Sequence, residues 1–238
     1  ALLVDYLTRN NALTLDAAVK LRQTDVQTNG ANTGIELSSE HVAVPLGSLQ
    51  AGHLIVTAGA EHLTINGDAA QAELFRAHFG TLAPSVFVDQ GLVKIYYRHA
   101  LLNWNAGTAD VTLHGGIPWR LDVVSSGAAC IADLRSVPLS SLDVNGKASN
   151  IEITLPRPTA GVSFRIAGNA SHIIVRRATG SAMQVRLGRG ASNLIIDGQD
   201  FSAVGSKPYS TANYADTPQR YDIDVTARHT TVTIETYN

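Results

Sequence analysis

Short runs of alternating apolar and polar residues recur along most of the chain. In Leu142-Asp-Val144 two apolar positions flank a polar one, a short polar turn follows, and the alternation resumes at Ile151-Glu-Ile153, seven residues after Val144. The same frame and the same offset occur where Val56, Val123, Ile166, Leu187 and Val225 are followed by Leu63, Cys130, Ile173, Leu194 and Val232. Period-two alternation in runs rich in Val and Ile predicts β-strands with one buried face.

The spacing of these copies predicts the architecture. Val123 to Val144 is 21 residues, Val144 to Ile166 is 22, and Ile166 to Leu187 is 21. An immunoglobulin-like sandwich also spaces its strands regularly, but it does not repeat one motif this often. A repeat cannot bury its apolar face alone, so stacked neighbours must supply the core. We therefore predict an all-β fold, a single-chain β-solenoid of coils of about 21 residues over 47–238, with Ile151, Ile173, Leu194 and Val232 in one buried row.

Several segments depart from the repeat. The interval from Leu187 to Val225 is 38 residues, which predicts an inserted loop at 198–220. The interval from Val56 to Val123 is 67 residues, close to three periods, which predicts degenerate coils between them. Val88 to Ile95 is either a looser seventh copy or a hairpin. The composition of Ala69–Phe79 favours a short helix or turn over one end of the stack.

Residues 1–46 lack the repeat and are expected to form an irregular N-terminal segment that caps the solenoid or contacts a partner. Leu13–Val26 fits either a helix or two strands. The C-terminal copy ends near Ile234, so the last coil needs a cover, either the 198–220 loop or another molecule. The first residues are unusually apolar and form a candidate assembly segment that is lent to a neighbour or packs on its own chain: Leu2, Leu3, Val4, Tyr6 and Leu7.

Composition narrows the class of partner. The net charge is −2 and charged residues make up 16% of the chain, which argues against non-specific nucleic-acid binding. No apolar run is long enough for a transmembrane helix. The one cysteine, Cys130, cannot form an internal disulfide, and we expect a buried thiol. The sequence begins at Ala1 without Met, so a processed or truncated product is expected. A cell-envelope or extracellular location is favoured, and a cytoplasmic one stays open.

Four phrases between the repeats carry a family resemblance: Ile117-Pro-Trp119, Leu155-Pro-Arg-Pro158, Asp197-Gly-Gln-Asp-Phe201 and Tyr221-Asp-Ile-Asp-Val225. With the repeat, they make residues 47–237 resemble the bacterial proteins grouped as putative adhesins with a toastrack-type β-solenoid domain. The resemblance implies a single-chain stack of strands, often attached to a membrane or surface protein, without an established enzymatic site. The chain departs from the pattern in its first 46 residues and at turn positions such as Ser125, Ser126 and Arg189. No functional residue is therefore carried over.

The sequence shows no motif for catalysis, for a metal ion or for a cofactor. It has no Gly-x-Ser-x-Gly elbow and no His-x-x-x-His spacing. The outward slot of the first strand in each copy instead holds a mixed set of charges. Asp143 would meet Arg165 in stacked coils, and Arg186 could meet Asp224. A surface ion-pair ladder is the favoured interpretation of this slot, and the groove of a polysaccharide-processing enzyme is the remote one.

The inserted loop offers two aromatic rings and an amide, Tyr209, Tyr214 and Asn213, as candidates for contact with a ligand or partner. Such groups suit sugars, although a packed loop explains them as well. The leading prediction is a non-enzymatic structural or interaction module that binds a protein or itself, as a homo-oligomer or filament. A carbohydrate-binding adhesin is the alternative.

Overall fold

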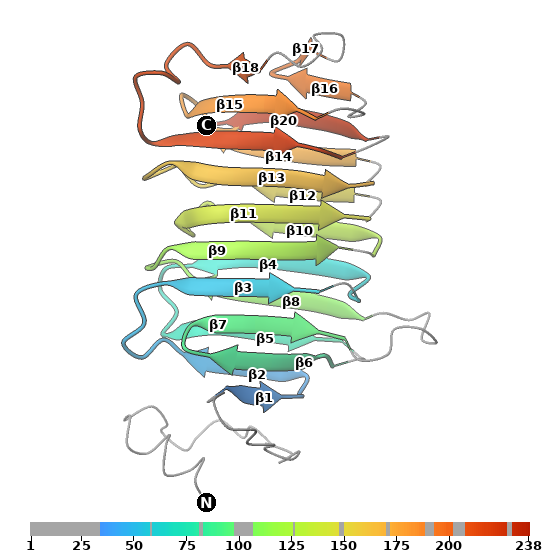
Figure 1. Ribbon diagram of the computed structural model, residues 1–238. Helices are drawn as coiled ribbons and strands as arrows, with labels where there is room; N and C mark the ends of the chain where they lie inside the picture. Colours follow the sequence, from blue (N-terminus) through green and yellow to red (C-terminus); the bar gives the residue numbers. More distant parts are fainter. Residues whose placement is uncertain are drawn as a thin grey trace, which may run out of the picture.

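Two ten-stranded sheets face each other along a column (Figure 1). This computed structural model describes residues 34–57, 59–80, 83–97, 107–125, 127–147, 150–169, 172–188, 193–201, 208–227 and 230–238. All regular elements within these ranges are strands. No helix in the described part of the chain is long and apolar enough to cross a membrane. The predicted all-β solenoid is confirmed.

Each coil gives one strand to each sheet, here called sheet A and sheet B. The coils that match the sequence repeat, each with its sheet A strand first, are β3 (Gly52–Val56) with β4 (His62–Asp68), β9 (Trp119–Ser125) with β10 (Ala129–Asp133), β11 (Leu139–Gly146) with β12 (Asn150–Thr154), β13 (Val162–Gly168) with β14 (His172–Ala178), β15 (Ala182–Leu187) with β16 (Asn193–Ile196), and β19 (Arg220–Val225) with β20 (Thr231–Tyr237). All of these strands pair in parallel with the neighbouring coil.

Equivalent apolar residues stack into continuous buried rows. In sheet B, Cys130 pairs with Ile151, Ile151 with Ile173, and Ile173 with Val232, which pairs in turn with Leu194. Each of these side chains is at most 3% exposed. The predicted row therefore exists, Cys130 is part of it, and its order is Ile151, Ile173, Val232, Leu194.

That order shows that the coils do not stack in sequence order at the C-terminal end. The coil of β15 and β16 lies outermost, and the coil of β19 and β20 inserts between it and the coil of β13 and β14. The C-terminus accordingly lies beside the column, below its upper end (Figure 1). The last coil in the sequence is thus covered on both sides by its own chain, and the expectation that it would need a cover is wrong.

The other end departs from sequence order as well. Strand β3 pairs directly with β9, with Val56 opposite Val123. The described parts of the intervening chain lie beyond β3 and β4 and add β5 (Glu73–Phe79), β6 (Ser85–Asp89), β7 (Leu92–Tyr96) and β8 (Thr108–His114). One further coil is present in this interval, because β7 and β8 pair in parallel with β3 and β4. It does not stack between Val56 and Val123, however, since it lies on the outer side of β3 and β4.

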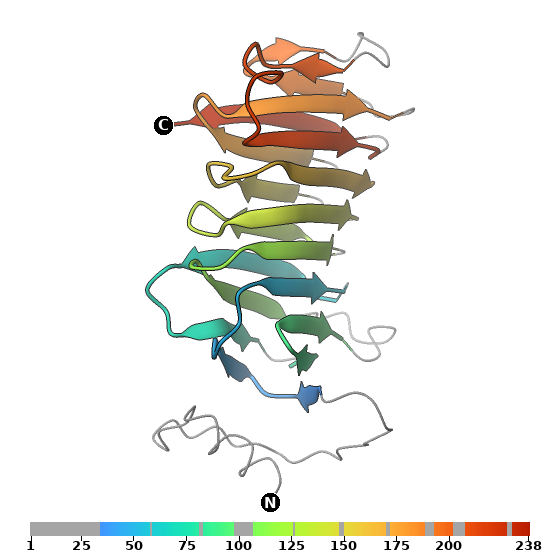
Figure 2. The same ribbon diagram turned by 60° about the vertical axis from the view of Figure 1, so that its left-hand side comes forward.

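Antiparallel strands close both ends, and Figure 2 shows them above and below the parallel coils. At the upper end, β17 (Gln199–Asp200) and β18 (Tyr209–Ser210) come from the predicted 198–220 insertion. At the lower end, β1 (Ile35–Leu37) and β2 (His41–Pro45) come from the segment before residue 47. Short edge strands and a proline such as Pro45 hinder pairing with another chain. The candidate assembly segment at Leu2 to Leu7, and Leu13–Val26, lie outside the described residues.

Two local predictions are settled at the lower end. Ala69–Phe79 is not helical, because Phe75, Ala77 and Phe79 turn inward as strand β5 pairs with β2 and β8. Val88 to Ile95 spans the hairpin of β6 and β7. Its two turn residues, Gln90 and Gly91, have φ of 43° and 89°, as a two-residue hairpin of type I′ requires.

The phrases between the repeats are explained by packing. Trp119 is fully buried over Gly52, where any side chain would collide with the indole ring. The hydroxyls of Tyr221 and Tyr237 donate hydrogen bonds to the carbonyls of Pro156 and Leu155, at 2.8 and 2.6 Å. The two tyrosines thus connect the turn after β12 to strands β19 and β20. Burial raises the pKa of Tyr221 above its usual range.

The buried row predicts opposite outcomes for two adjacent isoleucines. Ile173 is fully buried, whereas Ile174 points outward on the same strand. Ile173→Asp places an unpaired charge in the core and should unfold the protein at 25 °C. Ile174→Asp should leave it folded, with a change of about 1 kcal/mol or less in the free energy of unfolding. Circular dichroism during urea titration measures both, and a folded Ile173→Asp variant would contradict the register.

The order of coils predicts which engineered cysteines can join. Arg165 on β13 is directly opposite Asp224 on β19, and Arg186 on β15 lies one strand further. Neighbouring strands are about 4.8 Å apart, within the Cα separation that a disulfide spans, but two strand spacings are not. Arg165→Cys with Asp224→Cys should therefore oxidise to a disulfide, and Arg165→Cys with Arg186→Cys should not. Thiol titration and mass spectrometry measure disulfide formation. The opposite outcome would show that the coils stack in sequence order.

Candidate interaction surface

The outer face of sheet A carries the charged slot seen in the sequence. Because alternate residues of a strand point to opposite faces, the residue between two core positions faces solvent. Parallel register places these residues side by side in one row across five strands, in the order Asp122, Asp143, Arg165, Asp224, Arg186. We call this row the charged row.

Opposite charges meet in two places along the charged row. An Arg165 guanidinium nitrogen lies 3.5 Å from a carboxylate oxygen of Asp143, and Arg186 lies 3.5 Å from Asp224. All four side chains are more than one third exposed. Each pair therefore contributes about 0–1 kcal/mol at most, because water and salt screen it. The structure brings together the two pairs named from the sequence, and Asp224 also stands next to Arg165 in register.

A tighter cluster lies at the end of the charged row nearest β3. His53 Nε2 is 2.6 Å from an Asp122 carboxylate oxygen, and Arg120 Nε donates to the same oxygen at 3.1 Å. Arg120 and His53 are paired residues of β9 and β3. The sequence repeat did not reveal this contact because it joins strands that are 69 residues apart in the chain.

The inserted loop places its predicted residues on different faces of the sheet. Tyr209 pairs with the core residue Val185 and its ring packs against Phe201, with ring centroids 4.8 Å apart. Tyr214 instead lies on the outer side, where its hydroxyl donates to Asp222 and the Arg220 guanidinium covers its ring at 4.5 Å. The two rings therefore do not form one platform.

The remaining loop contacts fix the segment onto the last coils. Asn213 donates a side-chain hydrogen bond to the carbonyl of Gly180 at 3.1 Å. Thr211 accepts from the Met183 amide with its hydroxyl oxygen at 3.0 Å. The hydrogen bond to Asp222 raises the pKa of the Tyr214 phenol, because the carboxylate would repel a phenolate. Tyr214 thus stays a neutral donor at neutral pH.

The outer face of sheet B has a different electrostatic centre. Arg176 on β14 donates to Glu152 on β12 at 2.9 Å and to Glu235 on β20 at 2.7 Å. One guanidinium thus bridges three adjacent strands. The hydrogen bond from Arg176 lowers the pKa of the Glu152 carboxyl below its usual value, and a second bond from Asn150 adds to this. We call these three residues the arginine bridge.

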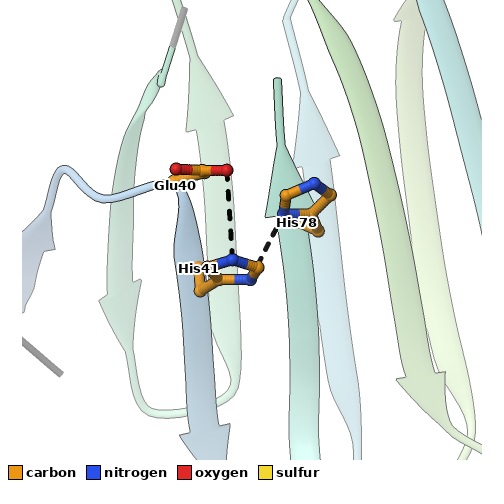
Figure 3. Close-up of side chains that lie close together, drawn as sticks. All are labelled: Glu40, His41 and His78. Atoms are coloured by element: carbon orange, nitrogen blue, oxygen red, sulfur yellow. Dashed lines mark hydrogen bonds and ion pairs between the residues drawn. The ribbon is translucent and has the colours of Figure 1, made fainter. Parts of the chain in front are cut away.

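The structure also assembles a group that the sequence gave no reason to expect. Glu40, His41 and His78 offer ligand atoms within 4.8 Å of one another at the lower end of sheet B (Figure 3). The two histidines are 37 residues apart, and both lie outside the regular repeat. No short sequence motif contains both histidines, because they become neighbours only when strands β2 and β5 pair.

A comparison with one solved structure supports the fold. No family model matches the chain, and a search of curated proteins gives no match either. Among solved structures, a putative cell adhesion protein from Clostridium sporogenes superposes with a TM-score of 0.72 at 17% identity, covering 86% of this chain and all of that one. A putative adhesin from Bacteroides fragilis aligns over 87% of this chain and 98% of its own, with a TM-score of 0.32 and 7% identity.

The class of protein defined by these findings is a column-like β-solenoid with antiparallel ends. The chain shares this fold with the Clostridium sporogenes protein. The family resemblance drawn from the sequence is confirmed as a likeness of fold.

The arginine bridge predicts a pH-dependent contribution to stability. The pKa of Glu152 is lowered in the folded state from the ordinary value of 4.5, so the stabilisation is present above that pH and is lost as the pH falls through the folded value. Glu152→Gln should lower the free energy of unfolding at pH 7 by on the order of 1 kcal/mol, since the pair is partly exposed. The difference should shrink as the pH falls below 4.5 and through the lowered folded-state pKa.

Thermal unfolding of the two proteins between pH 3 and pH 7 measures this difference. Glu61→Gln, at an exposed glutamate outside the arginine bridge, is the matched control. Equal melting temperatures of wild type and Glu152→Gln across the whole range would contradict the assigned role.

Proposed function

We propose that this chain is a non-enzymatic adhesion module that presents the outer face of sheet A to a protein partner. The observation that carries this proposal is the charged row, in which Asp143, Arg165, Asp224 and Arg186 alternate in charge along a rigid sheet. The likeness of fold to a protein described as a putative cell adhesion protein supports an adhesion-related role at a surface.

The sheet gives this face the properties of a recognition surface. Its central strands are hydrogen-bonded on both sides, so the backbone holds each charged residue at a fixed position. The charges follow one another at the strand spacing of about 4.8 Å. Solenoids commonly bind partners along such extended surfaces. A row of exposed charges contributes mainly to specificity and to the rate of association, because complementary rows attract and mismatched ones repel.

The two alternatives have less support. A sugar site would favour an exposed aromatic platform, but Tyr209 is packed on Phe201 and the Tyr214 ring is covered by Arg220. A polysaccharide-processing site needs carboxyl groups arranged as acid and base or nucleophile. On the described outer face of sheet A, Asp122, Asp143 and Asp224 each have an arginine neighbour instead. Among the described residues, neither alternative has an observation of its own in its favour.

The ends of the column are less suited to binding another chain than its faces are. Among the described residues, the outer edges are strands of two to five residues, and β2 ends at Pro45. Such edges are poor templates for another strand. We therefore propose binding across sheet A rather than end-to-end growth.

Surface plasmon resonance tests this function with the chain immobilised against panels of extracellular and cell-wall proteins and of glycans. Replacing Arg165 and Arg186 by Ala should weaken a protein interaction about tenfold and reduce its salt dependence, because rim charges act mainly on association. A control double variant away from sheet A, Arg76→Ala on β5 of sheet B with Arg135→Ala in the turn after β10, should bind as wild type. Selective glycan binding, or equal loss in both variants, would contradict the proposal.

A further inference from the structure

We propose that Glu40, His41 and His78 form a binding site for a divalent transition-metal ion of the zinc class. The three residues are close to one another at the lower end of sheet B, and the dashed lines in Figure 3 mark the contacts between them. The site goes beyond the proposed role of the sheet A face, since it lies on the other sheet. We call it the histidine site.

Strand pairing places the two histidines at close range. His41 on β2 is directly opposite His78 on β5. The amide of Phe79 donates to the carbonyl of Glu40 at 2.8 Å, so Glu40 and Phe79 form a hydrogen-bonded pair of the antiparallel strands. The next pair, His41 and His78, is therefore a non-hydrogen-bonded pair, in which the side chains approach most closely.

The spacing of the two ring nitrogens fits two ligands of one ion. The Nδ1 atoms of His41 and His78 are 3.2 Å apart. Zinc binds histidine nitrogen at about 2.0–2.1 Å in a tetrahedral arrangement, which separates two ligand nitrogens by about 3.3 Å. The rings are stacked, with centroids 4.4 Å apart and planes at 22°. Because the rings are stacked, one exposed ring must turn about its side-chain torsions before both lone pairs point at a shared ion.

Glu40 completes the donor set from the bend that precedes β2. The ligand atom that it offers lies within 4.8 Å of those of both histidines. The side chains of Glu40 and His41 are 64% and 73% exposed. Two imidazoles and one carboxylate suit zinc and its neighbours in the transition series, whereas calcium and magnesium prefer oxygen ligands alone. Three protein ligands also leave a coordination position open for water or for a group of a partner.

An ion at the histidine site would stabilise the edge of sheet B. Strand β2 is the last strand of sheet B and pairs with β5 alone among the described strands. An ion held by His41 and His78 would join this edge strand to its neighbour through side chains as well as backbone. Because a ligand that binds the folded state stabilises it by mass action, bound zinc should raise the melting temperature.

Calorimetric titration of zinc chloride into the full chain tests the site, with competition by a chromogenic chelator to measure affinity. We expect one saturable site, which His41→Ala or His78→Ala weakens by roughly 100-fold, and Glu40→Gln by less. Magnesium and calcium should not compete. His62→Ala and His172→Ala are the matched controls, since both are exposed histidines on strands of sheet B.

Thermal unfolding provides the second measurement. Zinc should raise the melting temperature of wild type and of both controls, and should not raise that of His41→Ala or His78→Ala. Because these side chains are exposed, the variants are expected to fold, and circular dichroism verifies this. Absence of saturable zinc binding in wild type, or binding that survives in both His41→Ala and His78→Ala, would overturn the proposal.

Discussion

Every coil of this column depends on the coils beside it for both its backbone hydrogen bonds and its core. Parallel register makes each residue meet its equivalent one strand away, so an apolar inner slot becomes a buried row such as Cys130, Ile151 and Ile173. The same register turns an outer slot into the charged row. A slip of one residue would expose the whole core, which explains why the alternation is kept in every copy. Core and surface are thus two consequences of one pairing rule.

That dependence leaves a problem at the ends, where a coil has a neighbour on one side only. At both ends, the spatial order of the coils differs from their order in the sequence. At the upper end it runs outward to β15 and β16, forms short antiparallel strands with residues of the inserted loop, and returns to place β19 and β20 inside. At the lower end the residues after β4 extend beyond it in the same way. The insertion at 198–220 therefore serves to cover the end and to carry the chain back.

The sequence predicts what depends on local alternation and not what depends on the choice of neighbour. Strand positions, the buried row and the pairs Asp143–Arg165 and Arg186–Asp224 follow from the repeat. The order of coils does not, because Val225 and Leu187 are equally suitable partners for Ile166. Composition was also a poor guide at Ala69–Phe79, where pairing with β2 and β8 prevails over helical propensity. The contacts of His53 with Asp122 and of His41 with His78 stayed hidden for the same reason, since each joins segments that only the fold brings together.

The contrast between the regular parallel coils and the antiparallel ends also explains where a cluster of ligand side chains can form in such a fold. Within the regular coils, a side chain must suit its equivalents about 4.8 Å away on both sides, which favours opposite charges or small polar groups in succession. Arg176 between Glu152 and Glu235 is one such arrangement. At the antiparallel ends the repeat no longer dictates the residue, and a non-hydrogen-bonded pair brings two side chains closer than any parallel neighbours. Two histidines beside a glutamate are compatible with that setting, and would be disfavoured in a row that repeats from coil to coil. The proposed recognition surface accordingly lies on a face of the column, and the proposed metal site lies at its end.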